Sequence, residues 1–188
     1  EIADYAFAYT AKLTSITIPD SVVSIGNSAF NQCSDLTSVV LPLGITKISD
    51  SMFYGCVNLT DVSIPNNVTS IEQYAFGGCE SLTNITIPNS VTEIGNRAFA
   101  ECASLKRFNG KFAVDNGRCL IKDETLIAYA EASGTEYEIP ANVTTIGKNA
   151  FYYCRSLTNI IIPNGITTIE YSAFQGCRMS SVTIPESV

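Results

Sequence analysis

Cysteine is the residue with the clearest capacity for chemistry in this chain, and histidine is absent. The 188 residues include seven cysteines and no histidine. Without histidine, the commonest general base and every Ser–His or Cys–His nucleophile pair are missing. Acidic residues such as Asp35, Glu72 and Glu93 do not pair at a recognisable spacing. We therefore expect no catalytic site and no cofactor.

Six of the cysteines recur at a fixed interval. They step by 23 residues with one break of 52, and stand at Cys33, Cys56, Cys79, Cys102, Cys154 and Cys177. The prolines from Pro19 to Pro185 follow the same interval and the same break. A fixed period of this length indicates stacked structural repeats. Because 52 is 23 plus 29, one coil has 29 residues, and it lies between Leu105 and Gly134.

The regular repeat unit predicts two short strands and a turn. Ile85 and Ile87 alternate with polar residues, which is typical of a strand with one buried face, and Pro88 ends that strand. A second extended segment spans Val91 to Ile94, and residues 96–102 close the coil with a helical or 3₁₀ turn. The phenylalanine three residues before each cysteine position should form an internal aromatic ladder, made of Phe30, Phe53, Phe76, Phe99, Phe151 and Phe174.

The spacing of the cysteines allows three interpretations. We favour a stack of buried free thiols, each acting as a small apolar residue. Disulfides between neighbouring coils are an alternative, which the fixed side-chain directions of stacked coils disfavour. A metal site is the third; cysteines that are 23 residues apart in a ladder offer no tetrahedral closure. We therefore expect a structural ladder without metal.

The unit L-x-x-I-x-I-P-x-x-V-x-x-I-x-x-x-A-F-x-x-C-x-x resembles the leucine-rich repeat of the BspA-like family of bacterial surface proteins. The resemblance covers nearly the whole chain. It implies a leucine-rich-repeat solenoid, a β-rich member of the α/β repeat class, in which 23-residue coils stack with parallel β-sheets. It also implies an extracellular or cell-surface protein that adheres to host or other cells by binding protein or glycan. The alternative function is a passive spacer or surface-layer scaffold.

We expect one solenoid domain over residues 1–188, with regular coils at about 1–104 and 134–188 and an irregular coil at about 105–133. Within the irregular coil, Asp115-Asn116-Gly117 predicts a tight hairpin turn between two apolar segments. Residues 125–130 can add a further strand, which would make a small β excursion from the rod. The chain begins inside a repeat, so we expect a fragment of a longer protein, whose cut ends favour end-to-end self-association.

Charge and hydropathy exclude two further classes of function. The net charge is −7 and the 11 lysines and arginines are scattered, which argues against nucleic acid as a partner. No apolar run of about 18 residues is present, so no transmembrane segment is expected.

Two groups of residues are candidates for binding a partner. Exposed tyrosine is enriched where proteins bind, which singles out Tyr54, Tyr152 and Tyr153, although these rings have the alternative of packing over the coil corner. Protrusions from a regular scaffold often carry function, although the β excursion has the alternative of being a tolerated insertion. Its candidate residues are Asp115, Asn116, Arg118, Asp123 and Glu124.

Overall fold

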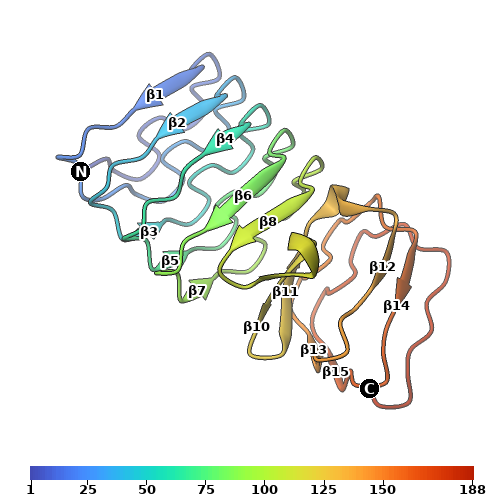
Figure 1. Ribbon diagram of the computed structural model, residues 1–188. Helices are drawn as coiled ribbons and strands as arrows, with labels where there is room; N and C mark the ends of the chain where they lie inside the picture. Colours follow the sequence, from blue (N-terminus) through green and yellow to red (C-terminus); the bar gives the residue numbers. More distant parts are fainter.

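The computed structural model describes all 188 residues and is a solenoid whose coils stack along one axis (Figure 1). The first strand of each coil pairs in parallel with the residue 23 positions later, as in Ile16 with Val39. These strands are β1 (Ser15–Thr17), β2 (Ser38–Val40), β4 (Asp61–Val62), β6 (Asn84–Ile87), β8 (Arg107–Gly110), β12 (Glu136–Glu138) and β14 (Asn159–Ile161). The predicted solenoid of parallel strands is confirmed.

A second series of two-residue strands forms the next side of each coil. It consists of β3 (Lys47–Ile48), β5 (Ser70–Ile71), β7 (Glu93–Ile94), β13 (Thr145–Ile146) and β15 (Thr168–Ile169). One isoleucine of each strand points inward, and Ile48, Ile71 and Ile146 are fully buried. The apolar positions of both series therefore meet in one narrow core.

A six-residue turn, which we name the corner turn, closes each regular coil. The corner turns are residues 4–9, 27–32, 50–55, 73–78, 96–101, 148–153 and 171–176. The second and sixth residues have positive φ, as at Tyr74 (53°) and Gly78 (70°). Alternate N–H groups therefore point along the solenoid axis, and the N–H of Phe76 donates to the Ala98 oxygen of the next coil at 2.8 Å. The expected helical or 3₁₀ turn is wrong here, because a helix would keep these hydrogen bonds within one coil.

Phenylalanine and cysteine fill the core beneath the corner turns. The predicted aromatic ladder is present, with ring centroids of neighbouring stacked phenylalanines 5.0 to 5.7 Å apart. The seven cysteines are free thiols, and six of them are buried. The Cys56 thiol donates to the Phe30 oxygen of the preceding coil at 3.1 Å, and four other cysteines make the same contact. Burial raises the pKa of Cys56 and of Cys102 to about 12, so these thiols are protonated, structural groups.

The irregular coil contains the predicted hairpin. Its elements are β9 (Ala113–Val114), η1 (Asp115–Gly117), β10 (Cys119–Lys122), β11 (Thr125–Tyr129) and η2 (Glu131–Ser133). β9 and β10 pair antiparallel through Cys119 and Val114, and β11 is the predicted further strand. The hairpin does not stand clear of the rod as expected, because β11 also pairs in parallel with β13 and Leu120 and Leu126 are fully buried. The two 3₁₀ segments are the only helices, and neither has the length and apolar character needed to cross a membrane.

The regular hydrogen-bond ladders stop between β8 and β12, at a boundary that we name the junction. β8 pairs only with β6, and β12 pairs only with β14. In the preceding corner turn, the N–H groups of Arg97, Phe99 and Glu101 have no backbone acceptor, whereas their counterparts in the other paired coils do. The buried apolar residues correspondingly form two clusters, of 32 and 15 residues. The solenoid is thus built of two stacks that meet at the irregular coil.

Tyrosine replaces phenylalanine in the core at the junction. The Tyr129 ring lies 5.1 Å from Phe151, and its N–H donates to the Ala150 oxygen at 3.0 Å, as a ladder phenylalanine would do. The sequence analysis missed this role, although Ala128-Tyr129 precedes Ala150-Phe151 by 22 residues and could have been read as the same motif.

Candidate binding site at the corner turns

Tyrosine is concentrated in the corner turns. Seven of the nine tyrosines lie there, namely Tyr5, Tyr9, Tyr54, Tyr74, Tyr152, Tyr153 and Tyr171. Within each turn the central alanine or methionine and phenylalanine point into the core, so the remaining side chains face outward along one edge of the solenoid. Tyr9 and Tyr171 are both 73% exposed. The edge therefore presents aromatic rings over most of its length.

Five of the outward side chains contact one another in a continuous row, which we name the corner strip. It consists of Tyr54, Tyr74, Arg97, Tyr152 and Tyr153. The Tyr54 and Tyr74 rings meet edge to face at 5.6 Å, and the Tyr152 and Tyr153 rings at 4.6 Å. All five side chains are half-buried. The row joins the predicted Tyr54 to the predicted Tyr152 and Tyr153.

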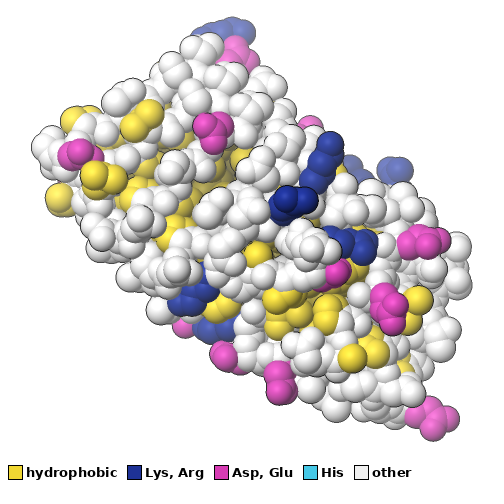
Figure 2. Space-filling view, in the orientation of Figure 1, with side chains coloured by type: hydrophobic (Ala, Val, Ile, Leu, Met, Phe, Trp, Pro, Cys, Tyr) yellow, Lys and Arg dark blue, Asp and Glu magenta, His cyan; other side chains and the backbone are white.

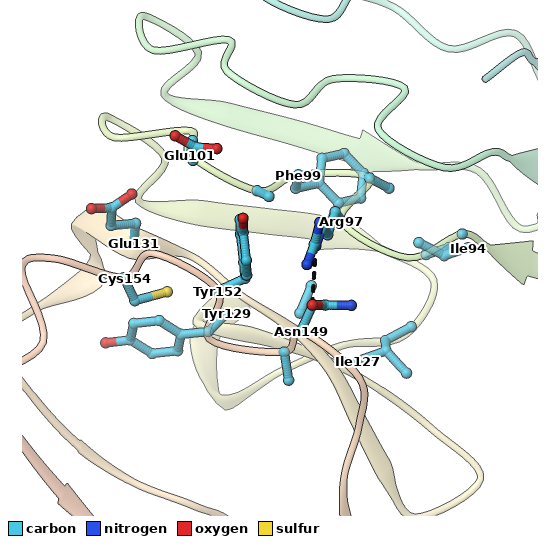
Figure 3. Close-up of a pocket in the computed structure, with 15 residues that line it drawn as sticks. Ile94, Arg97, Phe99, Glu101, Ile127, Tyr129, Glu131, Asn149, Tyr152 and Cys154 are labelled. Carbon is cyan, nitrogen blue, oxygen red and sulfur yellow. Dashed lines mark hydrogen bonds between the residues drawn. The ribbon is translucent and has the colours of Figure 1, made fainter. Parts of the chain in front are cut away.

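Arg97 carries the corner strip across the junction (Figure 3). Its guanidinium carbon lies 4.0 Å from the Tyr152 ring centroid and 5.5 Å from that of Tyr74. Its Nε donates to Asn149 Oδ1 at 3.0 Å, and its Nη1 donates to the Tyr74 hydroxyl. One arginine from the first stack thus binds two side chains of the second.

A small cavity lies beneath Arg97 and Tyr152, between residues 94–101 and residues 127–154 (Figure 3). Its volume is about 20 Å³, which is room for one water molecule. Glu131 lines it, and burial raises the pKa of this carboxyl, although the backbone N–H of Arg155 opposes the shift. The cavity is too small for an organic substrate.

The corner strip offers stacking and hydrogen bonding rather than acid–base chemistry. Burial raises the pKa of Tyr152, although the Arg97 guanidinium opposes the shift, so the phenol is neutral. No group of three or more cysteine, aspartate or glutamate side chains is arranged to hold a metal ion. What remains is a platform of rings with one cation in its middle, which suits a partner with planar or apolar groups.

The predicted residues of the irregular coil lie in two other places. Asp115 and Arg118 face a solvent-open groove of about 580 Å³, whose far side is β12 and the residues that follow it; Asn116 is exposed on the same turn. Asp123 and Glu124 are exposed at the opposite end of β10. The eight candidates therefore do not form one site.

Sequence reasoning missed Tyr74 and Arg97, which connect the strip. Both stand two residues before a ladder phenylalanine, at the first positive-φ position of the corner turn. Grouping the outward residues of all corner turns by their offset from phenylalanine would have placed them beside Tyr54 and Tyr152.

The outward face of the first strands contrasts with the corner strip. Its side chains are small and mostly uncharged, as at Ser15, Ser38 and Thr86. The face in Figure 2 carries scattered charges on a largely uncharged polar surface. This face has no aromatic anchor for a partner.

Comparison with known proteins identifies relatives of the same architecture. The model of the BspA type leucine-rich repeat region matches six copies over residues 1–116 and 126–188. A leucine-rich cell surface protein from Faecalibacterium prausnitzii is 29% identical with a TM-score of 0.66, covering 94% of this chain and 62% of that protein. A leucine-rich repeat protein from Bacteroides ovatus is 29% identical with a TM-score of 0.71, covering 99% of this chain and 47% of that protein.

A third solved structure, the leucine-rich repeat protein of T. pallidum, is 28% identical with a TM-score of 0.61, covering 89% of this chain and 65% of that protein. The chain thus spans between 47% and 65% of the length of these three proteins. No curated protein matches the sequence. Because the repeat model matches nearly all coils, and the coils have the strand pairing and ladder described above, the chain belongs to the BspA-type leucine-rich repeat family.

Proposed function

We propose that this chain is a non-catalytic surface repeat protein that adheres to a protein or glycan on a host or other cell, with the corner strip as its contact. The continuous row of Tyr54, Tyr74, Arg97, Tyr152 and Tyr153 carries the proposal. The description of the Faecalibacterium prausnitzii relative as a cell surface protein supports the location.

The geometry of the strip suits binding. Tyrosine and arginine are the residues most enriched at interface hot spots. The five side chains are already held by one another, so little side-chain entropy remains to be lost when a partner binds. Coils stack at about 4.8 Å, so the row is roughly 20 Å long, a length that matches an ordinary protein interface.

The proposal is tested by measuring binding of the soluble chain to an array of extracellular matrix proteins and glycans. The test variant carries Tyr54→Ala, Tyr152→Ala and Tyr153→Ala. The control carries Ser15→Ala, Ser38→Ala and Thr86→Ala on the strand face, where substitutions remove no ring. Both are first checked for folding by circular dichroism and thermal unfolding.

Saturable binding that weakens about tenfold or more in the tyrosine variant, but not in the control, supports the proposal. Binding that both variants retain contradicts the assignment of the strip. The absence of any ligand across the array, with all proteins folded, favours the spacer function.

A further inference from the structure

The first strand after the junction has one edge without a neighbouring strand. The N–H of Ile139 donates to the Ile161 oxygen at 3.1 Å, on the side of β14. Successive residues of a strand direct their backbone groups to alternate sides. The N–H and C=O of Glu138 therefore face away from β14, into the groove beside Asp115 and Arg118. An unpaired strand edge of this kind is a template for another strand.

The irregular coil keeps this edge uncovered. In the regular array a strand of the preceding coil would pair with β12, but β8 pairs only with β6. The 3₁₀ segment η1 packs instead on β8, so closely that a Cβ at Gly117 would collide with the Phe108 oxygen. The groove that remains has a volume of about 580 Å³ and is lined by Val114, Asp115 and Arg118 on one side and by residues 138–142 on the other.

The charges of the groove are unbalanced. Asp115 and Glu138 line it, and Glu136 stands beside them on the same strand. Arg118 is the only cation in the lining, and its guanidinium is occupied. Its Nη2 donates to the Glu136 oxygen at 2.6 Å, and its charge lies 3.9 Å from the Asp115 carboxylate and 4.7 Å from the Tyr137 ring. The carboxylate of Glu138 has no cation within ion-pair distance.

We propose that the groove binds an extended peptide segment of a partner protein that carries lysine or arginine. The segment adds a strand to β12 by pairing with the backbone of Glu138, and its cations lie against Asp115 and Glu138. Strand addition derives affinity from main-chain hydrogen bonds and selectivity from alternate side chains. The carboxylates exclude acidic segments, and Pro140, which lacks an N–H, ends the pairing after Ile139. The corner strip contributes no residue to this site.

The test is a titration of the ¹⁵N-labelled chain with the capped pentapeptide Thr-Lys-Val-Lys-Thr, followed by amide chemical shifts. Two comparison peptides isolate the two parts of the contact. In Thr-Glu-Val-Glu-Thr the charge is reversed, and in a third peptide the backbone nitrogens of the lysine peptide are methylated. We expect the lysine peptide to shift the Glu138 amide and those around it saturably, and the comparison peptides to shift none of them.

Protein variants separate backbone pairing from charge. Glu138→Pro removes the N–H that faces the groove and leaves every bond to β14, whereas Glu138→Ala keeps the N–H and loses the charge. Glu138→Lys reverses the charge, and Asp61→Lys makes the same change on β4, outside the groove. We expect Glu138→Pro and Glu138→Lys to weaken binding about tenfold or more, Glu138→Ala less, and Asp61→Lys not at all.

Three results would overturn the proposal. They are the absence of saturable shifts at Glu138, equal binding of the methylated peptide, and equal loss in Asp61→Lys and Glu138→Lys, which would indicate non-specific charge attraction. The opposite-charge substitutions keep the test decisive if the proline variant fails to fold.

Discussion

The buried cysteine illustrates what a single residue contributes to each coil. It is small enough for the corner, and its thiol supplies a hydrogen-bond donor to the phenylalanine oxygen of the preceding coil, at 3.0 to 3.3 Å in five coils. The 23-residue spacing of these cysteines, without histidine, was sufficient to predict free thiols with a structural role. The hydrogen bond to the preceding coil was not predictable, because it depends on where the turn directs each carbonyl.

These thiols should make stability fall in alkaline solution. The unfolded chain loses its thiol protons near the ordinary pKa of 9.0, whereas folded Cys56 and Cys102 retain theirs to about 12. Between these values the folded state binds more protons, so the free energy of unfolding decreases as pH rises, by about 1.4 kcal/mol per pH unit for each such thiol. Urea unfolding at a series of pH values under reducing conditions measures this slope. The Cys56→Ala variant should show a shallower slope; an identical slope would contradict the assignment.

The positive φ angles of the corner turns predict a second effect. Gly78 has φ +70°, and a Cβ added there would meet only Gly55 at an ordinary 3.5 Å. Gly78→Ala should therefore lower the free energy of unfolding by about 1 kcal/mol, from the left-handed conformation alone. Gly165→Ala is the matched control, since this glycine has no positive φ and its nearest neighbour is 3.4 Å away. Equal urea midpoints for Gly78→Ala and the parent chain would show that the turn tolerates a side chain.

At the scale of elements, the sequence predicted the strands better than the turns. Alternating isoleucines and a terminal proline define the strands, because burial of one face is a local, period-two signal. The corner turn was mistaken for a helical turn, since Ala98, Phe99 and Cys102 also fit one face of a helix. Its left-handed residues include Ser28, Tyr74 and Arg97, which have no intrinsic preference for that conformation. The ladder to the next coil imposes it.

The corner strip also depends on elements that the sequence does not place together. Tyr54 and Tyr152 were predicted as binding residues, but their connection through Tyr74 and Arg97 requires the register of coils on both sides of the junction. The groove beside β12 was equally unpredictable, because it results from the pairing that β8 and β12 fail to make.

Arg97 should be a main stabiliser of the junction. It contacts Tyr74, Asn149 and Tyr152, where backbone hydrogen bonds between coils are missing. Arg97→Ala should cost about 1–2 kcal/mol of unfolding free energy, and a double-mutant cycle with Tyr152→Leu should show coupling. Lys12→Ala is the control; its ion pair with Asp35 is solvent-exposed and should contribute less than about 1 kcal/mol. Additive effects of Arg97→Ala and Tyr152→Leu would contradict a direct contact.

At the scale of the whole molecule, the chain consists of two stacks with separate cores. Native-state hydrogen exchange should reveal the boundary. The amides of Phe99 and Glu101, which lack acceptors, should exchange faster than those of Phe76 and Gly78, which are bonded to the next coil, by on the order of tenfold or more. Equal protection of the two corner turns would mean that the ladder continues through the junction.

The two stacks are held in register by Arg97 and the hairpin, so the corner strip presents its rings as one surface. Adhesion through that surface is the central claim. It is tested most directly by hydrogen-exchange footprinting of the chain bound to a partner recovered from the array. We predict slower exchange in corner turns 50–55, 73–78, 96–101 and 148–153, with the first-strand face unchanged. A footprint on the strand face, or no recovered partner at all, would contradict the claim.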